Sequence, residues 1–211
     1  MRLRKFSIQL WVNVVLVCSG ALATSVSGQQ RQLSRDELIA AAREIMTTTR
    51  YCALITVDRS GRAQARTMDA FAPDEKMIVW FGTNPLTRKV AEIRRHPRVT
   101  LYYFDRENQA YVTIHGTARL VNDAQEKARH WKDDWKTFYP DRDKNYLLIE
   151  VRPLTLEVVN TKKGIIGDPR TWRPPTVKFS LVRSEGPSLN SHGREAVVSR
   201  NKNGRAPKVR H

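Results

Sequence analysis

The chain has 211 residues, which is enough for one well-packed core and too few for two sizeable domains. Its formal net charge of +16 points to an anionic partner: nucleic acid, an anionic membrane or an anionic small ligand. Much of the excess lies at the ends, because residues 1–28 carry no acids and residues 180–211 carry seven cations against two acids. The middle, 29–179, carries 27 cations against 19 acids, so it is a moderately basic domain rather than a polycation.

Residues 1–28 are typical of a secretory signal peptide. A basic start, MRLRK, precedes the mostly apolar segment FSIQLWVNVVLV, and small residues follow at two candidate cleavage sites. The sequence therefore predicts an exported protein, periplasmic or secreted, with no stable membrane span after cleavage. The alternative is an anchor formed by uncleaved residues 6–28, which are long enough to cross a bilayer.

The next segments predict a helix followed by a group of strands. Ser34 and Glu37 have the spacing of a capping box, and apolar residues then fall on one face of a helix over 34–50. Apolar or alternating runs predict strands over 51–57, 63–71 and 77–82, joined by short turns. We expect these three strands to form an antiparallel meander.

The second half continues the alternation of strands and helices. The pattern predicts a helix that starts at Pro85 and ends at His96, then strands over 98–104 and 110–121, with a bulge at Gly116. It also predicts a long amphipathic helix over 123–139 and two strands, 146–151 and 154–159, separated at Pro153. Residues 180–211 are basic and poor in aromatics, so we expect a disordered tail.

These elements indicate a protein that is mainly β with inserted helices, in one domain over 33–179. Six or seven short strands with hairpin spacing favour an antiparallel sheet, most economically a small closed or partly closed barrel. The alternation of helices and strands is too irregular for a doubly wound parallel fold.

A candidate anion site lies in WFGTNPLTRK, residues 80–89. Arg88 and Lys89 occupy the start of a helix, whose positive end disfavours cations unless an anion is bound there. A phosphate fits this set, because Thr83 and Thr87 add hydroxyls and Arg66 comes from a neighbouring strand. The simpler interpretation is a solvated basic helix face, and no nucleotide-binding motif is present to decide between the two.

The order of several segments resembles a known family. RTM, IVWFGTN, TRK, HPRVTLYYFD, YVTIHGTARLV and KARHWKDDWKTFYP follow one another as in the pyridoxamine 5′-phosphate oxidase-like proteins, closest to their general stress protein branch. The resemblance covers roughly residues 35–178. It implies a six-stranded split β-barrel that forms a homodimer with FMN at the subunit interface.

The resemblance also assigns residues to the cofactor. It implies that Arg66, Arg88 and Lys89 hold the FMN phosphate, and that the backbone of Thr67-Met68 and Gly82-Thr83 lines the ribityl chain and the ring. Tyr111 stands where pyridoxamine phosphate oxidases have a glutamine facing the flavin. Their substrate-binding C-terminal segment is replaced here by GDPRTWRPPTVKF, in which Trp172 is the candidate to reach the partner's flavin.

We therefore expect an FMN-dependent oxidoreductase acting on an unidentified small substrate, and do not expect oxidation of pyridoxamine phosphate itself. The redox chemistry would be the cofactor's, and no residue is singled out as catalytic. The alternatives are a non-catalytic binder of flavin, heme or deazaflavin and, more distantly, a nucleic-acid binder. The sequence has no metal-ligand spacing around His130. Cys52, Trp131 and Trp135 are expected in the core.

Overall fold

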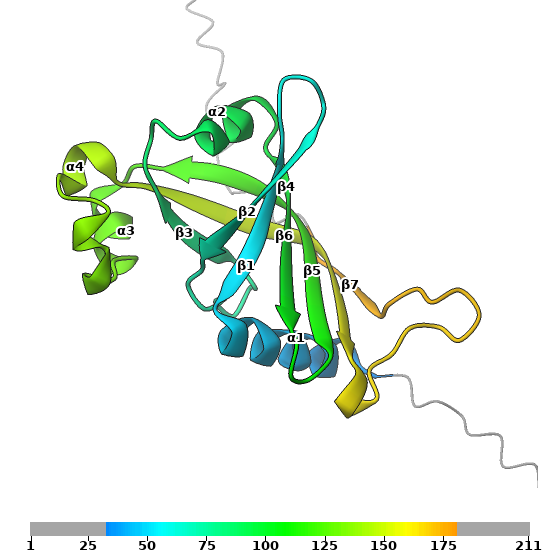
Figure 1. Cartoon of the computed structure of the whole chain (residues 1–211). Helices are drawn as coiled ribbons and strands as arrows, with labels where there is room; N and C mark the ends of the chain where they lie inside the picture. Colours follow the sequence, from blue (N-terminus) through cyan, green and yellow to red (C-terminus); the bar gives the residue numbers. More distant parts are fainter. Residues whose placement is uncertain (1–32, 181–211) are drawn as a thin grey trace, which may run out of the picture. The chain divides into compact units, whose positions relative to one another are not determined.

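The computed structural model describes residues 33–180 (Figure 1). The expected signal peptide and nearly all of the expected C-terminal tail lie outside this range and remain predictions. Within residues 33–180, no helix is both long and apolar enough to cross a membrane.

Helix α1, Arg35–Thr49, forms as the capping box predicts. Ser34 Oγ accepts a hydrogen bond from the Glu37 backbone, and the Glu37 carboxylate accepts one from the Ser34 backbone. The apolar face of the helix is buried against the sheet, and in Figure 1 α1 lies at the opposite end of the strands from α2, Arg88–Arg95. Arg50 ends the helix with a φ of 58°, which turns the chain directly into the first strand, β1, Tyr51–Val57.

The strands form one antiparallel sheet in the order β2-β1-β4-β5-β6-β3, with β7 added on β6. An isolated bridge between Ala70 and Phe81 links the two outer strands, so the sheet curls into a barrel. This confirms the mainly β, split-barrel fold. The strands are β1 Tyr51–Val57, β2 Ala63–Asp69, β3 Val79–Thr83, β4 Arg98–Asp105, β5 Ala110–Val121, β6 Leu147–Asn160 and β7 Thr176–Lys178.

The prediction of a three-stranded meander was wrong. Strands β1 and β2 pair as expected, but β3 pairs with β6, and its link to β2 is the isolated bridge of Phe81 with Ala70, just past the end of β2. Hydrophobic alternation predicts where strands lie in the sequence, but it does not predict which strands pair in the sheet. The closure of the barrel brings β3 against a strand that lies more than 60 residues later in the chain.

The two strands expected over 146–159 are one strand, β6, with Pro153 inside it. The register shifts between His115 and Gly116, so that Gly116 pairs with Pro153 while Leu154 has no partner on β5. A bulge is where a proline can sit in a strand, because it cannot donate to the ladder. A Cβ on Gly116 would lie 2.6 Å from the Arg152 carbonyl oxygen, so this bulge requires glycine.

Helix α2, Arg88–Arg95, begins three residues later than predicted. Pro85 lies in a turn held by Asn84, whose side chain accepts a hydrogen bond from the Leu86 backbone and whose carbonyl accepts one from the Thr87 backbone. Thr87 is the N-cap residue but makes no side-chain cap hydrogen bond. Arg88 and Lys89 are therefore the first two helical residues, where the backbone N–H groups have no partner within the helix.

The predicted long helix over 123–139 is broken. The segment forms α3, Ala124–Arg129, and a 3-10 helix η1, Asp133–Thr137, and the short helix α4, Arg142–Asn145, follows it. In Figure 1, α3 and α4 lie together beside the barrel. Tertiary contacts explain the break: Lys132 and Trp135 both reach Asp69 on β2, and Trp135 packs with Trp131 and Tyr146. These contacts outweigh the modest helix propensity of the segment.

The barrel interior is apolar, with Leu54, Leu101, Ile114 and Leu156 fully buried. Cys52 is confirmed as a core residue, since it is 3% exposed. Burial raises the pKa of its thiol to about 12, which keeps it protonated and unreactive at neutral pH.

Candidate functional site

A cavity of about 350 Å³ lies between β2, β3, the start of α2 and the η1 segment. Five of the nine predicted cofactor residues line it: Thr67, Met68, Gly82, Thr83 and Lys89. Its volume is within the range of small-molecule sites. The remaining lining residues are Asp69, Asn84, Thr87, Trp135, Phe138 and Tyr139.

Lys89 faces one end of this cavity. Its Nζ donates a hydrogen bond to Thr83 Oγ1 at 3.1 Å, and the Thr83 and Thr87 hydroxyls are 3.2 Å apart. Burial lowers the pKa of Lys89, the nearby charge of Arg66 lowers it further, and Glu92 acts in the opposite direction. A bound anion would stabilise the charged form of Lys89 against this burial and repulsion. The Lys89 ammonium and the uncapped N–H groups of α2 therefore form an anion-binding end of the cavity.

Arg66 and Arg88 both bind one carboxylate, that of Glu92. Arg66 Nη2 lies 2.9 Å from Glu92 Oε2, and Arg88 Nε lies 3.2 Å from Glu92 Oε1. Glu92 is 3% exposed, and its Oε2 also accepts a hydrogen bond from Thr56. The interpretation of α2 as an entirely solvated basic face was therefore wrong for Lys89, while Arg88 remains largely exposed beside Glu92.

The opposite end of the cavity is held by Asp69. Arg50 binds its carboxylate through two hydrogen bonds of 2.7 and 2.8 Å, Lys132 donates at 2.7 Å, and Trp135 Nε1 donates at 3.2 Å. Burial alone would raise the pKa of Asp69, but the hydrogen bonds and charges of Arg50 and Lys132 prevail and lower it to about 2. Asp69 thus fastens the η1 segment to β2 and fixes Trp135 as a wall.

This network predicts a pH dependence of stability. Because the pKa of Asp69 is about 2 in the folded protein and 3.8 otherwise, its stabilisation is complete above about pH 5 and is lost as the pH falls toward 2. The loss should amount to about 1–2 kcal/mol after allowance for solvent screening. Urea unfolding at several pH values between these limits should show this loss of unfolding free energy. In Asp69→Asn the unfolding free energy should depend less steeply on pH, because the contribution of Asp69 is gone. An unchanged slope in the variant would contradict the assignment.

Gly82 is needed where β3 passes under the aromatic wall. A Cβ at this position would lie 2.4 Å from the Trp135 ring and 2.7 Å from the Tyr146 ring. The Trp135 and Tyr146 rings therefore pack directly on the β3 backbone at Gly82, and any larger residue would displace them.

Tyr111 and Trp172 do not line this cavity. Tyr111 lies on β5, with its ring centroid 5.8 Å from that of Tyr102. Trp172 lies in the loop before β7, is 84% exposed and has a φ of 57°. Neither residue reaches the site of its own subunit, so any role of these two at a flavin requires a second copy of the chain.

Sequence reasoning missed Glu92, Asp69, Phe138 and Tyr139. Glu92 is the single acid of α2, four residues after Arg88, and this spacing is the one signal that identifies it. Asp69 and the two aromatics gave no such signal, since the broken helix that brings them together was predicted as continuous.

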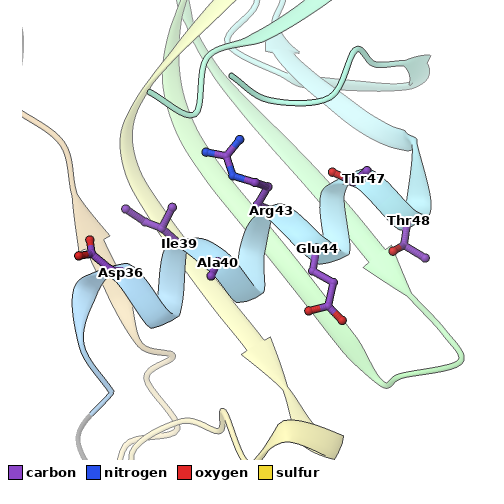
Figure 2. A pocket seen from close by; sticks show the side chains of 7 residues that line it. All are labelled: Asp36, Ile39, Ala40, Arg43, Glu44, Thr47 and Thr48. Atoms are coloured by element: carbon purple, nitrogen blue, oxygen red, sulfur yellow. The ribbon is translucent and has the colours of Figure 1, made fainter. Parts of the chain in front are cut away.

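A second hollow, of about 500 Å³, lies along the outer face of α1 (Figure 2). All seven residues that line it belong to this one helix, from Asp36 to Thr48. Two of these side chains have partners elsewhere, since Arg43 donates to the Pro73 carbonyl and Glu44 binds Lys163. No residue outside α1 lines the hollow, so it lacks the convergent chemistry of the cavity around Lys89.

The chain matches the family model described as pyridoxamine 5′-phosphate oxidase like over residues 37–167. Among characterised proteins it is similar to general stress protein 26 of Bacillus subtilis, with 28% identity over 111 residues, 51% of this chain and 77% of that protein.

Solved structures show the same fold. A Clostridium acetobutylicum protein related to general stress protein 26 superposes with a TM-score of 0.57 at 20% identity, covering 70% of this chain and 97% of that one. A pyridoxamine 5′-phosphate oxidase-related, FMN-binding protein of Nostoc punctiforme gives 0.52 at 14% identity, covering 71% and 98%. The chain belongs to the pyridoxamine 5′-phosphate oxidase-like family.

Proposed function

We propose that this protein binds FMN in the cavity between β2, β3 and α2, with the phosphate at Lys89 and the ring toward Trp135 and Tyr139. The observation that carries the proposal is the charge at the anion-binding end. Lys89 lines the cavity, while Arg66 and Arg88 do not line it and are bound nearby to the Glu92 carboxylate. Together these three cations and one carboxylate carry a net charge of about +2. A phosphate monoester carries about −1.5 to −2 at neutral pH, so the two charges match.

The rest of the cavity fits a flavin as well. Thr67, Met68 and Gly82 line the cavity from the two strands, and Trp135 and Tyr139 line it with aromatic side chains against which a planar ring could pack. The Nostoc punctiforme relative described as FMN-binding has the same fold. A bound flavin would supply hydride or electron transfer, while the protein holds its phosphate and shapes the space beside the ring.

We also propose that the chain is a homodimer that uses its exposed aromatic face, defined by Tyr51, Tyr102, Phe104 and Tyr111. Tyr51 is 52% and Phe104 56% exposed on neighbouring strands, and the Tyr102 and Phe104 rings stack 6.5 Å apart. Such a continuous apolar face is typical of an interaction surface. A dimer through this face would bring Tyr111 toward the partner rather than toward its own cavity.

The double variant Tyr102→Lys, Phe104→Lys should therefore be monomeric, because two buried charges per subunit would have to be desolvated at the interface. Light scattering coupled to gel filtration measures the change. Leu86→Lys is the matched control, since Leu86 is 90% exposed and belongs to the loop between β3 and α2, not to the strands that carry this face. A wild-type chain that is monomeric at every concentration would contradict the dimer.

A second candidate function is a flavin or deazaflavin carrier without catalysis. It is favoured by the state of the titratable groups that line the cavity. Lys89 is bonded to Thr83, Asp69 accepts bonds from three side chains, and burial raises the pKa of Tyr139 to about 12. No acid or base among these residues is free for proton transfer at neutral pH.

One experiment tests both functions. The purified full chain is mixed with FMN, its visible spectrum is recorded, and NADH or NADPH is then added with an electron acceptor. Flavin bands that bleach and recover over many turnovers support an oxidoreductase, and bands that do not respond to either donor support a carrier. A Soret band in the purified protein, or no flavin bound from micromolar FMN, would contradict the proposal.

A further inference from the structure

Another cleft, of about 430 Å³, lies beside α2 and shares none of the residues that line the cavity around Lys89. It is formed by the turn between β1 and β2 and the outer face of the helix, and four arginines line it. We call it the arginine cleft and define it by Arg59, Arg62, Arg88 and Arg95. Asp58 and Glu92 are the acids that line it.

Both acids are already engaged. Asp58 binds Arg62 at 3.1 Å and accepts hydrogen bonds from the backbone N–H groups of Ser60 and Arg62. Glu92 binds Arg88 and, on its other oxygen, Arg66. Within residues 33–180, Arg59 and Arg95 form no ion pair, although both face the same cleft.

Like charges that share a cleft repel one another, and an anion between them reverses the cost. The turn that carries Arg59 and Arg62 is fixed by the Asp58 side chain, so part of the cleft is preorganised. The helix dipole favours a cation at the C-terminal end of a helix, so Arg95 can be explained even if no ligand binds there. That reason does not apply to Arg59, which lies in a turn.

The helix itself provides a comparison. Arg94 and Arg95 are neighbours in the last turn of α2, with the same relation to the dipole, but Arg94 lines a different hollow, beside Pro85, Asp143 and Lys144. If the cleft binds an anion, only Arg95 contributes to it directly.

We propose that the arginine cleft binds an oxyanion, a phosphate or a carboxylate, separate from the phosphate held at Lys89. The oxyanion has two sources: a further anionic group on a flavin cofactor that extends past its first phosphate, or an independent small anion. The extended cofactor rests on the proposed flavin function: Lys89 faces the flavin cavity, and its neighbour Arg88 lines the cleft, so one cofactor would have to reach both sites. The independent small anion does not depend on flavin binding.

Calorimetric titrations of the full chain separate these sources, with inorganic pyrophosphate as the independent anion and FAD against FMN as the extended cofactor. Each titration is repeated with Arg59→Ala, Arg95→Ala and the matched control Arg94→Ala. Since a charge-assisted hydrogen bond to an oxyanion is strong, the first two variants should weaken binding roughly tenfold and the control by less than about twofold. Circular dichroism checks that these exposed substitutions leave the fold intact.

Pyrophosphate binding by the flavin-free chain that depends on Arg59 and Arg95 supports an independent anion. Tighter binding of FAD than of FMN, lost in Arg95→Ala but kept in Arg94→Ala, supports an extended cofactor. The proposal is overturned if pyrophosphate does not bind and FAD is no tighter than FMN, or if Arg94→Ala has the same effect as Arg95→Ala. A chain that binds no flavin but binds pyrophosphate in a way that depends on Arg59 and Arg95 supports the cleft and contradicts the proposed flavin function.

Discussion

Lys89→Ala is expected to raise the dissociation constant for FMN by roughly 10- to 100-fold. The substitution removes the ammonium that faces the cavity and the bond that orders Thr83, while leaving Arg66 and Arg88 on Glu92. A hydrogen bond to a charged group contributes about 1.5–3 kcal/mol, and this range gives the expected change. Quenching of flavin fluorescence on titration measures it directly.

Lys76→Ala is the matched control, because Lys76 is an exposed lysine on the turn before β3. It should leave the FMN constant within about twofold, which is the size of a general field effect in salt. Equal weakening by both substitutions would mean that overall charge, and not the geometry at α2, attracts the flavin.

Glu92→Gln is expected to lower the free energy of unfolding by about 3 kcal/mol, since breaking a buried ion pair leaves an uncompensated charge. Arg66 carries most of this cost because its side chain is only 18% exposed, while Arg88 is 71% exposed and reaches water. Glu92→Gln should also change the dissociation constant for FMN, because the Arg66 side chain would lose the carboxylate that holds it near Lys89.

Glu150 offers a matched comparison. It is 1% exposed and binds Arg119 and Arg152, but it does not line the cavity. Glu150→Gln should therefore destabilise the fold while leaving FMN binding unchanged in the folded protein. Denaturant midpoints and FMN titrations of both variants give the result. If Glu92→Gln changed stability by less than about 0.5 kcal/mol, Glu92 would not be the anchor of the two arginines.

Local features of the fold could be predicted from the sequence. The Ser34–Glu37 box fixed the start of α1, the alternating runs located β1, β4 and β5, and Gly116 marked the bulge. These features depend on residues close in sequence, where capping, periodicity and steric freedom act directly.

Features that depend on distant partners could not be predicted from the same patterns. The pairing of β3 with β6 follows from closure of the barrel, and the break in the 123–139 segment follows from Asp69, which lies more than 60 residues earlier. The candidate site shows the same division. Lys89 could be proposed from its place at a helix start and Glu92 from its spacing to Arg88, but the contact between Glu92 and Arg66 on β2 depends on the folded sheet.

FMN binding depends most on the phosphate site at Lys89, and comparing FMN with riboflavin tests that site most directly. The two ligands share the ring and the ribityl chain and differ in the phosphate alone. Titration of the purified full chain should give an affinity for FMN that is about 100-fold or more higher than for riboflavin, as expected when two or more charge-assisted bonds are lost. Equal affinity for the two ligands, or no binding of either, would contradict the account.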